Sequence, residues 1–274
     1  MESLPTAAFL GASYIGQSLI TGLLGSGVAK NKIILSDHNP NNLEYVGKHL
    51  GIKTDSSHAT VAALAPLLIL AAPAADTKAI AHEISGTLKT HHPLIISIAG
   101  GVHTAHLERW LGSHTAIVRA IPNIAALLQA SATGLYANLQ VTELQKNLAE
   151  SLLRTVGITV WIDHESDMDA VTALSEAGPA YFFVMMEALQ QSAEALGLRP
   201  AIAELLTLQT ALGAARVALE SEADLHELRR RIVSTGSATE TALNILEQGG
   251  LHTLFKKALG SAKERAVEMS HLFD

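Results

Sequence analysis

The sequence predicts an α/β protein, with a doubly wound sheet domain first and an all-helical domain second. Short apolar runs alternate with helix-like segments up to Asp163, and the runs lack the polar alternation of half-exposed strands. Continuous apolar runs are required by a parallel sheet covered on both faces, and strand–helix alternation is typical of doubly wound domains. After Asp163 only long helical stretches follow. We therefore predict domains at residues 1–163 and 164–274.

The strands of the first domain are predicted in order. The first, at residues 7–10, is stopped by Gly11, and apolar residues at helical spacing follow at 15–24. The second strand, 33–35, ends in a turn and helix-start cluster at 36–40. The remaining strands are predicted at residues 67–70, 94–98, 115–120, 132–136 and 158–162.

The second domain is predicted to be helical throughout. Its first helix has apolar residues on nearly every face between Tyr181 and Met186. A helix that is apolar all round is buried all round, and so short a domain achieves this most readily against a second copy of itself. We expect a homodimer through the C-terminal helices, with a larger assembly of dimers left open. The predicted helices are 178–196, 201–221, 224–232, 239–247 and 252–271.

Composition excludes several classes of protein. A chain of 274 residues that is 48% hydrophobic and 16% charged has ample core and is not disordered. Lys+Arg 19 against Asp+Glu 26 gives a net charge of −7, which argues against binding nucleic acid or anionic membranes. The one basic run, Arg229–Arg231, is interpreted as a solvated helix face. The absence of cysteine excludes disulfides, thiolate nucleophiles and Cys-ligated zinc.

The chain is also expected to be cytoplasmic and free of membrane spans. The segment Met1–Pro5 lacks the basic and apolar parts of a leader peptide. The most apolar stretch, Val61–Ala75, is too short to cross a bilayer and is broken by Pro66 and Pro73.

A glycine-rich turn lies between the first strand and the first helix. Gly11-Ala12-Ser13-Tyr14-Ile15-Gly16 matches the pattern G-x-G-x-x-G at its first and third glycines. Such a turn exposes backbone N–H groups at a helix N-terminus, where a pyrophosphate is stabilised. Ser13 replaces the middle glycine, and its hydroxyl is a potential phosphate donor. The turn predicts a Rossmann-like dinucleotide-binding domain, the alternative being a turn without a ligand.

Residues at the end of the second strand bear on the choice of dinucleotide. Asp37 stands where an acidic residue holds the adenosine ribose of NAD, or else it caps the next helix. Ser36 and His38 are instead suited to a 2′-phosphate. NAD and NADP both stay open, with NADP slightly preferred.

No metal site is expected, although the chain has 13 histidines. His103 and His106 precede Glu108, and His91-His92 adjoin a proline. Neither group forms the complete set of three or four ligands that a metal ion needs. The acidic segment 163–169 is interpreted as a solvated helix cap.

Five ordered blocks of sequence resemble the pyrroline-5-carboxylate reductase family, the last enzymes of proline synthesis. The strongest, Asp169–Tyr181, is similar to D-A-V-T-A-L-S-G-S-G-P-A-Y. Leu208–Ala214 resembles L-Q-T-x-x-G-A, and Ser97–Val102 resembles S-I-A-A-G-V. Arg119–Asn123 is similar to R-x-M-P-N, and Glu247–Leu251 to E-x-G-G-L.

The resemblance implies reduction of 1-pyrroline-5-carboxylate to L-proline by NADPH or NADH, with hydride delivered to C5 of the ring imine. It also implies that the cofactor contacts residues beyond the glycine-rich turn. These are Ala71, Ala72, Pro73, Ala99, Gly100 and Asn123.

A substrate loop is implied at residues 234–239, which resemble the family's S-P-G-G-T-T. The implied substrate residues are Ser234, Gly236, Ser237, Ala238 and Thr239. Thr239 is expected to be the catalytic hydroxyl nearest the imine nitrogen. The amides of Ser237 and Ala238 are expected to bind the substrate carboxylate. The alternative is that Ser234 only caps the helix that begins near Thr239.

Departures from the family pattern leave two alternative functions open. The family's A-V-K-P is matched by Ala71-Ala72-Pro73 without the lysine, and M-P-N-T-P becomes Ile121–Ala125. The first of the paired threonines is Ala238, and an arginine frequent after the second strand is His38. One alternative is a reductase of another cyclic imine or a keto acid. The other is a non-catalytic paralogue that keeps the dimer fold.

Overall fold

The computed structural model describes residues 4–274, so Met1–Ser3 of the N-terminal segment lie outside the described residues. The chain divides into two compact units. One comprises the residues up to Ala177 together with Ser261–Asp274, and the other comprises Gly178–Gly260. The boundary between the two units therefore lies after Ala177, later than the predicted boundary after residue 163. The C-terminal residues Ser261–Asp274 belong to the unit that contains the sheet.

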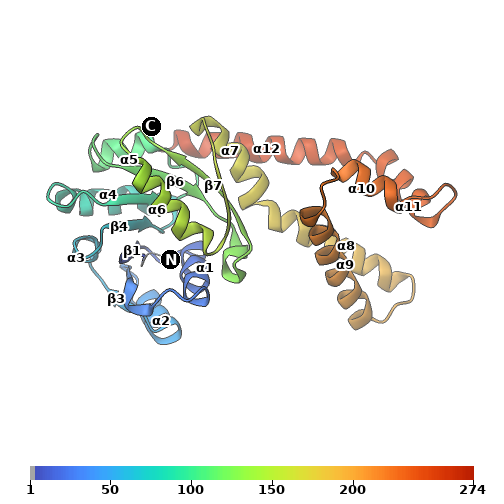
Figure 1. The fold of residues 1–274 in the computed structure, drawn as a ribbon, viewed down its shortest axis with the longest axis horizontal. Coiled ribbons are helices and arrows are strands. Elements are labelled where there is room, and N and C mark those ends of the chain that lie inside the picture. Colours follow the sequence, from blue (N-terminus) through green and yellow to red (C-terminus); the bar gives the residue numbers. More distant parts are fainter. Residues whose placement is uncertain (1–3) are drawn as a thin grey trace. The chain divides into compact units, whose positions relative to one another are not determined.

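The first unit contains an eight-stranded sheet in the order β3-β2-β1-β4-β5-β6-β7-β8 (Figure 1). Its first six strands follow the arrangement of doubly wound dinucleotide-binding folds. The strands are β1 (Ala7–Leu10), β2 (Ile33–Ser36), β3 (Lys53–Asp55), β4 (Leu67–Leu70), β5 (Leu94–Ser97), β6 (Ile117–Ile121), β7 (Ser131–Ala137) and β8 (Gly157–Trp161).

Every strand predicted from apolar runs is confirmed. All residues of β1, β2, β4, β5 and β6 are buried, as expected of strands covered on both faces. The prediction missed β3, because Lys53-Thr54-Asp55 is polar and lies at the edge of the sheet next to β2. Edge strands are frequently short and charged, so they carry no hydrophobic signal.

The parallel arrangement expected from the apolar runs ends at β7, which pairs antiparallel with β6. The link between them is short and holds only the 3₁₀ helix η2 (Ile124–Leu128). A parallel return needs a crossover of a dozen or more residues, so this link permits only the antiparallel direction. Strand β8 then pairs parallel with β7, after the helix α6 (Glu143–Arg154).

Helices cover both faces of the sheet in the first unit. One apolar cluster joins the strands to α1 (Tyr14–Gly25), α2 (Pro40–Leu50) and α6. The other joins them to α3 (His58–Ala62), α4 (Ala74–Leu88) and α5 (Thr104–Leu111). Phe273 packs against the second cluster and Arg109 donates to its carbonyl, which ties the C-terminus to α5.

The acidic segment 163–169 is a solvated cap only in part, because Asp163 and Asp167 are exposed whereas Glu165 and Asp169 pair with groups inside the first unit. Glu165 accepts hydrogen bonds from the Thr104 amide at 2.7 Å and from its hydroxyl at 2.6 Å. Asp169 is 3% exposed and lies 3.4 Å from the guanidinium of Arg119, which is itself fully buried. The segment forms η3 (Glu165–Asp167) and begins α7 (Met168–Val171), which is followed by the π-helical turn η4 (Thr172–Glu176).

The second unit is helical, as predicted. Its helices are α8 (Gly178–Ala195), α9 (Pro200–Glu220), α10 (Leu225–Ile232), α11 (Ala238–Gln248) and the first part of α12 (Leu251–His271). Arg229 pairs with Glu247, and Arg230 and Arg231 pair with Glu227, so the basic run is an exposed, paired face.

Large apolar side chains of the second unit are exposed in the single chain. On α8, Phe182 and Phe183 are 58% and 60% exposed, and on α9 Leu205 is 67% exposed. Among the described residues, α9 alone is long and apolar enough to cross a bilayer by length and composition, with a mean hydropathy of 1.3 over the window tested.

Candidate active site

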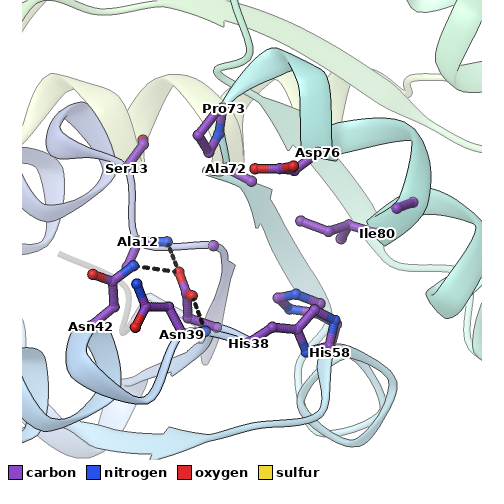
Figure 2. A pocket seen from close by; sticks show the side chains of 13 residues that line it. Ala12, Ser13, His38, Asn39, Asn42, His58, Ala72, Pro73, Asp76 and Ile80 are labelled. Atoms are coloured by element: carbon purple, nitrogen blue, oxygen red, sulfur yellow. Dashed lines mark hydrogen bonds between the residues drawn. The ribbon is translucent and has the colours of Figure 1, made fainter.

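A cavity opens where the strand order reverses, between the carboxyl ends of β1 and β4. Ligands of doubly wound folds bind at this switch point. The cavity has a volume of about 380 Å³, and side chains from the turns after β1, β2 and β4 point toward it (Figure 2). Its lining residues are Gly11, Ala12, Ser13, Asp37, His38, Asn39, Asn42, His58, Ala72, Pro73, Asp76, Ala79 and Ile80.

The expected cofactor residues fall into two groups. Those that line the cavity are Gly11, Ala12, Ser13, Asp37, His38, Ala72 and Pro73. Those that do not are Tyr14, Ile15, Gly16, Ser36, Ala71, Ala99, Gly100 and Asn123. Six further lining residues were not predicted from the sequence: Asn39, Asn42, His58, Asp76, Ala79 and Ile80. Asn39 and Asn42 were within reach, because they continue the cluster after β2, whereas His58 and α4 are brought in only by the fold.

The glycines of the turn let β1 and β4 approach closely. Gly11 has a φ of +95°, and a Cβ there would lie 2.5 Å from the Cβ of Ala72. A Cβ on Gly16 would lie 2.9 Å from the Cβ of Ala71. The two positions matched to the dinucleotide pattern are therefore the positions at which a side chain does not fit.

Most N–H groups of the turn are used within the protein. Gly11 donates to the Ser36 carbonyl at 2.8 Å, and Ser13 donates to the Ala71 carbonyl at 2.9 Å. Ser13 caps α1, because its hydroxyl accepts from the amide of Gly16 at 3.2 Å. Among the described residues, the amides of Tyr14 and Ile15 meet no acceptor. These two N–H groups at a helix start fit a pyrophosphate.

The Asp37 carboxylate, just after β2, is hydrogen-bonded to the glycine-rich turn. Its Oδ2 accepts from the Ala12 amide at 2.8 Å and from the Asn42 side chain at 3.2 Å, while Oδ1 accepts from the Asn39 amide at 2.7 Å. The alternative that Asp37 caps α2 is wrong, because the cap is Asn39, whose side chain accepts from the Asn41 amide. The carboxylate thus lies at the cavity edge, where a ribose hydroxyl is held in this fold.

Ser36 does not line the cavity. It is fully buried, and its hydroxyl lies 2.8 Å from Nδ1 of His58. The expected contact with a 2′-phosphate is therefore not available to it. Burial lowers the pKa of His58, with Glu83 and Asp37 opposing this effect and His38 adding to it.

The residues expected at the nicotinamide end follow the next two strands. Leu70 of β4 is in register with Ser97 of β5, and Ser97 with Arg119 of β6, so Ala99, Gly100 and Asn123 follow neighbouring carboxyl ends. Asn123 is 7% exposed and donates to the Ser175 carbonyl at 3.1 Å. A Cβ on Gly100 would lie 3.6 Å from Oε1 of Glu176. Burial raises the pKa of Glu176, against the effect of Arg119.

The loop implied to bind substrate, residues 234–239, belongs to the second unit and leads into α11. The cap of α11 is Ser237, which accepts from the Glu240 amide, so the alternative that Ser234 caps this helix is wrong. The Ser237 amide donates to the Ser234 carbonyl at 3.0 Å, and the Gly236 amide donates to Glu240 at 2.7 Å. In this conformation the Ser237 amide is therefore not available to a carboxylate. The Ala238 amide meets no acceptor among the described residues, and Thr239 is exposed.

A doubly wound sheet with a pyrophosphate-type helix start at its switch point defines the class: a dinucleotide-binding protein. Two family models match the chain. Residues 6–101 match "NADP oxidoreductase coenzyme F420-dependent", and residues 165–269 match "Pyrroline-5-carboxylate reductase dimerisation". The chain is 42% identical to a pyrroline-5-carboxylate reductase of Pseudomonas aeruginosa over 98% of both sequences. The chain belongs to the pyrroline-5-carboxylate reductase family.

Solved structures agree with this assignment. A pyrroline-5-carboxylate reductase from Coxiella burnetii superposes with a TM-score of 0.90 at 41% identity, covering 97% of this chain and 99% of that one. The Plasmodium falciparum pyrroline carboxylate reductase, solved with NADP bound, gives a TM-score of 0.89 at 25% identity, covering 98% and 99%. The resemblance inferred from sequence and the predicted fold class are both confirmed.

Proposed function

We propose that this chain reduces 1-pyrroline-5-carboxylate to L-proline with a nicotinamide hydride. The observation that carries the proposal is the cavity at the switch point, with two free amides at the start of α1, in a chain 42% identical to a curated reductase of this name. A dinucleotide would place its pyrophosphate at these amides. Its nicotinamide would extend toward Ala99, Gly100 and Asn123. The cofactor supplies the hydride, and the protein supplies orientation and electrostatics.

Thr239 is the catalytic residue of this proposal, through a hydroxyl near the ring nitrogen. Its loop also provides the Ala238 amide at the start of α11, where a carboxylate is stabilised by the helix dipole. Ser234 and Gly236 shape the turn, and Ser237 holds the start of the helix. We therefore assign the carboxylate to the Ala238 amide and not to that of Ser237.

A spectrophotometric assay tests this assignment. Purified protein with pyrroline-5-carboxylate and NADH or NADPH is expected to oxidise the cofactor, and Thr239→Ala is expected to lower kcat/KM about 100-fold. Thr239→Ser is expected to retain most activity. Thr241→Ala, two residues further along the same helix, serves as the matched control and should match the wild type. An unchanged rate in Thr239→Ala would remove Thr239 from the site.

The same assay separates the alternative functions. If the six-membered homologue of the substrate, or a keto acid, is reduced faster, the substrate assignment fails while the enzyme class stands. If fluorescence titration finds no binding of NADH or NADPH at millimolar concentration, the chain is a non-catalytic paralogue.

Cofactor preference is a finer proposal. The sequence favours NADP slightly, but the cavity geometry favours NADH. Its described lining contains Asp37 and Asp76 and no lysine or arginine, and His38 is paired with Glu83. A dianionic 2′-phosphate beside carboxylates is repelled. We expect NADH to bind about tenfold more tightly than NADPH, which corresponds to about 1.4 kcal/mol.

The chain is further proposed to act in the cytoplasm as a homodimer formed through the second unit, with no nucleic-acid or membrane partner. The match of residues 165–269 to a dimerisation family supports a second copy as the cover for the apolar faces of α8 and α9. On this account α9 is a helix of a subunit interface and not a membrane span. A larger assembly of dimers is an open part of the proposal.

A further inference from the structure

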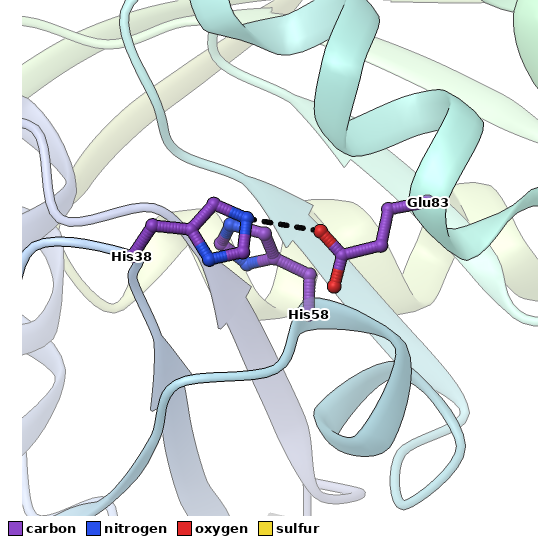
Figure 3. A group of neighbouring side chains, drawn as sticks. All are labelled: His38, His58 and Glu83. Atoms are coloured by element: carbon purple, nitrogen blue, oxygen red, sulfur yellow. Dashed lines mark hydrogen bonds and ion pairs between the residues drawn. The ribbon is translucent and has the colours of Figure 1, made fainter.

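Three side chains that are distant in the sequence meet beside the cavity. His38 follows β2, His58 begins α3 and Glu83 lies on α4 (Figure 3). One potential ligand atom from each lies within 4.8 Å of the others, and the two imidazole rings lie 4.4 Å apart between centroids. We propose that His38, His58 and Glu83 bind one divalent transition-metal ion of the zinc type on the wall of the dinucleotide cavity.

The protein orients both imidazoles through their second nitrogen. Nδ1 of His38 lies 3.1 Å from the carbonyl of Ser56, which can only accept, so this nitrogen carries the proton. Nδ1 of His58 lies 2.8 Å from the hydroxyl of Ser36. Because the Ser36 hydroxyl itself donates to the Phe9 carbonyl at 3.5 Å, it accepts from Nδ1 of His58, and this leaves Nε2 of both rings with the lone pair. Metal-binding histidines are held in this way, with the distal N–H bonded to a protein oxygen.

The carboxylate of Glu83 faces one of these lone pairs. Its Oε2 lies 3.0 Å from Nε2 of His38, while Oε1 accepts from the Ala59 amide at 3.2 Å. Two atoms with lone pairs at this distance require either a second proton on the ring or a cation shared between them. The set of two histidines and one glutamate is a ligand set of zinc sites with open positions.

The ligands have the freedom to close on an ion. Ligand atoms of a tetrahedral zinc with bonds of about 2.0–2.1 Å lie roughly 3.3 Å apart. His58 is 2% exposed and fixed, whereas the side chains of His38 and Glu83 are 65% and 30% exposed and are free to adjust. Because the three ligands come from three separate elements, no short spacing in the sequence predicts this set.

The ion would share a wall with the cofactor, because His38 and His58 both line the cavity. It would place positive charge where the described lining has no lysine or arginine. Metal and dinucleotide binding are then reciprocally coupled, and NADPH gains more than NADH because only NADPH carries the 2′-phosphate. This coupling rests on the proposed function, whereas the metal site does not.

Zinc binding to the full chain tests the site directly. The protein is freed of any histidine tag and stripped with a chelator, and isothermal titration with ZnCl₂ is expected to show one ion per chain. Glu83→Gln and His38→Gln are each expected to weaken binding at least about tenfold. His49→Gln, an exposed histidine of α2, and Glu44→Gln are the matched controls and should bind as the wild type does. Co²⁺ should give the visible absorption of a four-coordinate site.

Two results would overturn the site: the absence of stoichiometric zinc binding in the wild type, or unchanged binding in folded Glu83→Gln and His38→Gln. Because His58 is buried, His58→Gln is interpreted only with a native circular dichroism spectrum. Titrations of NADH and NADPH with and without one equivalent of Zn²⁺ then test the coupling, with NADPH affinity expected to rise about fivefold or more. Zinc binding that changes neither affinity refutes the coupling. Failure to bind any dinucleotide contradicts the proposed function and leaves the zinc result standing.

Discussion

At the scale of single residues, Glu176 stands where the resembling motif has a glycine. Its carboxyl group lies beside Gly100, and Oε2 is buried with no hydrogen-bond partner among the described residues. Desolvation raises the pKa of this carboxyl group, and the nearby Arg119 only partly compensates. The folded state therefore binds the Glu176 proton more tightly than the unfolded state does, and ionising Glu176 costs stability.

Replacing Glu176 with glutamine is expected to stabilise the protein at neutral pH by on the order of 1 kcal/mol. The gain should be full above the raised pKa of Glu176. It should disappear as the pH falls below the ordinary glutamate value of 4.5, where both states are protonated. Urea unfolding of Glu176→Gln and wild type at several pH values measures this difference. Glu264→Gln, an exposed carboxylate in the same unit, is the control, and a variant no more stable than wild type at pH 8 would refute the account.

At the scale of elements, a single buried guanidinium joins four parts of the first unit. Arg119 of β6 lies 3.4 Å from Asp169 of α7 and 3.6 Å from Glu165 of η3. Glu165 in turn accepts both polar hydrogens of Thr104 at the start of α5. The sequence placed Arg119 in a family motif and read the acidic residues as solvated. No pattern in the sequence indicated that the Arg119 side chain is buried in the first unit and pairs there with Glu165 and Asp169.

Arg119→Met is expected to destabilise the first unit by about 3–5 kcal/mol, because it leaves Asp169 buried without its partner. Asp169→Asn in the same background should recover part of the loss, which a double-mutant cycle measures by chemical unfolding. Arg154→Met is the control, since Arg154 pairs with Glu150 at the surface and should cost less than about 1 kcal/mol. An equal loss of unfolding free energy in Arg119→Met and Arg154→Met would show that the buried ion pairs of Arg119 stabilise the protein no more than a surface pair does.

Helices and strands were predicted correctly where a pattern of neighbouring residues is enough to specify them. Apolar runs marked every buried strand, and residues with helical periodicity marked every long helix of the second unit. Local rules failed at β3, which has no apolar run, and at β7, whose direction depends on the length of its link to β6. Two caps that the sequence left as alternatives, Asp37 for α2 and Ser234 for α11, are Asn39 and Ser237 in the structure.

At the scale of the whole molecule, the apolar surface of the second unit requires a cover. Isolated monomers rarely expose so many large apolar side chains on neighbouring helices. Size-exclusion chromatography with light scattering is expected to give a dimer or a multiple of it at micromolar concentration. Phe183→Glu with Leu205→Glu should weaken association at least about tenfold, because carboxylates would be buried unpaired.

The control for this experiment is Leu139→Glu in the first unit. Leu139 is fully exposed, so the same change of apolar to acidic side chain should leave the oligomeric mass unchanged. A wild-type protein that elutes as a monomer would contradict the proposed dimer, and then α9 would need another explanation for its apolar length.

Sequence patterns were sufficient for the fold class, the family and the glycine-rich turn. Each of these is written in consecutive residues: strand and helix periodicities, a glycine motif and five ordered blocks. They were insufficient for the assignment of individual polar groups. Folding revealed that Asp37 holds the Ala12 amide, that Ser36 faces inward, and that His58 and Glu83 join His38 at the cavity. The physical reason is that hydrogen bonds and charges act over a few ångströms in space, and the fold brings together groups that lie tens of residues apart along the chain.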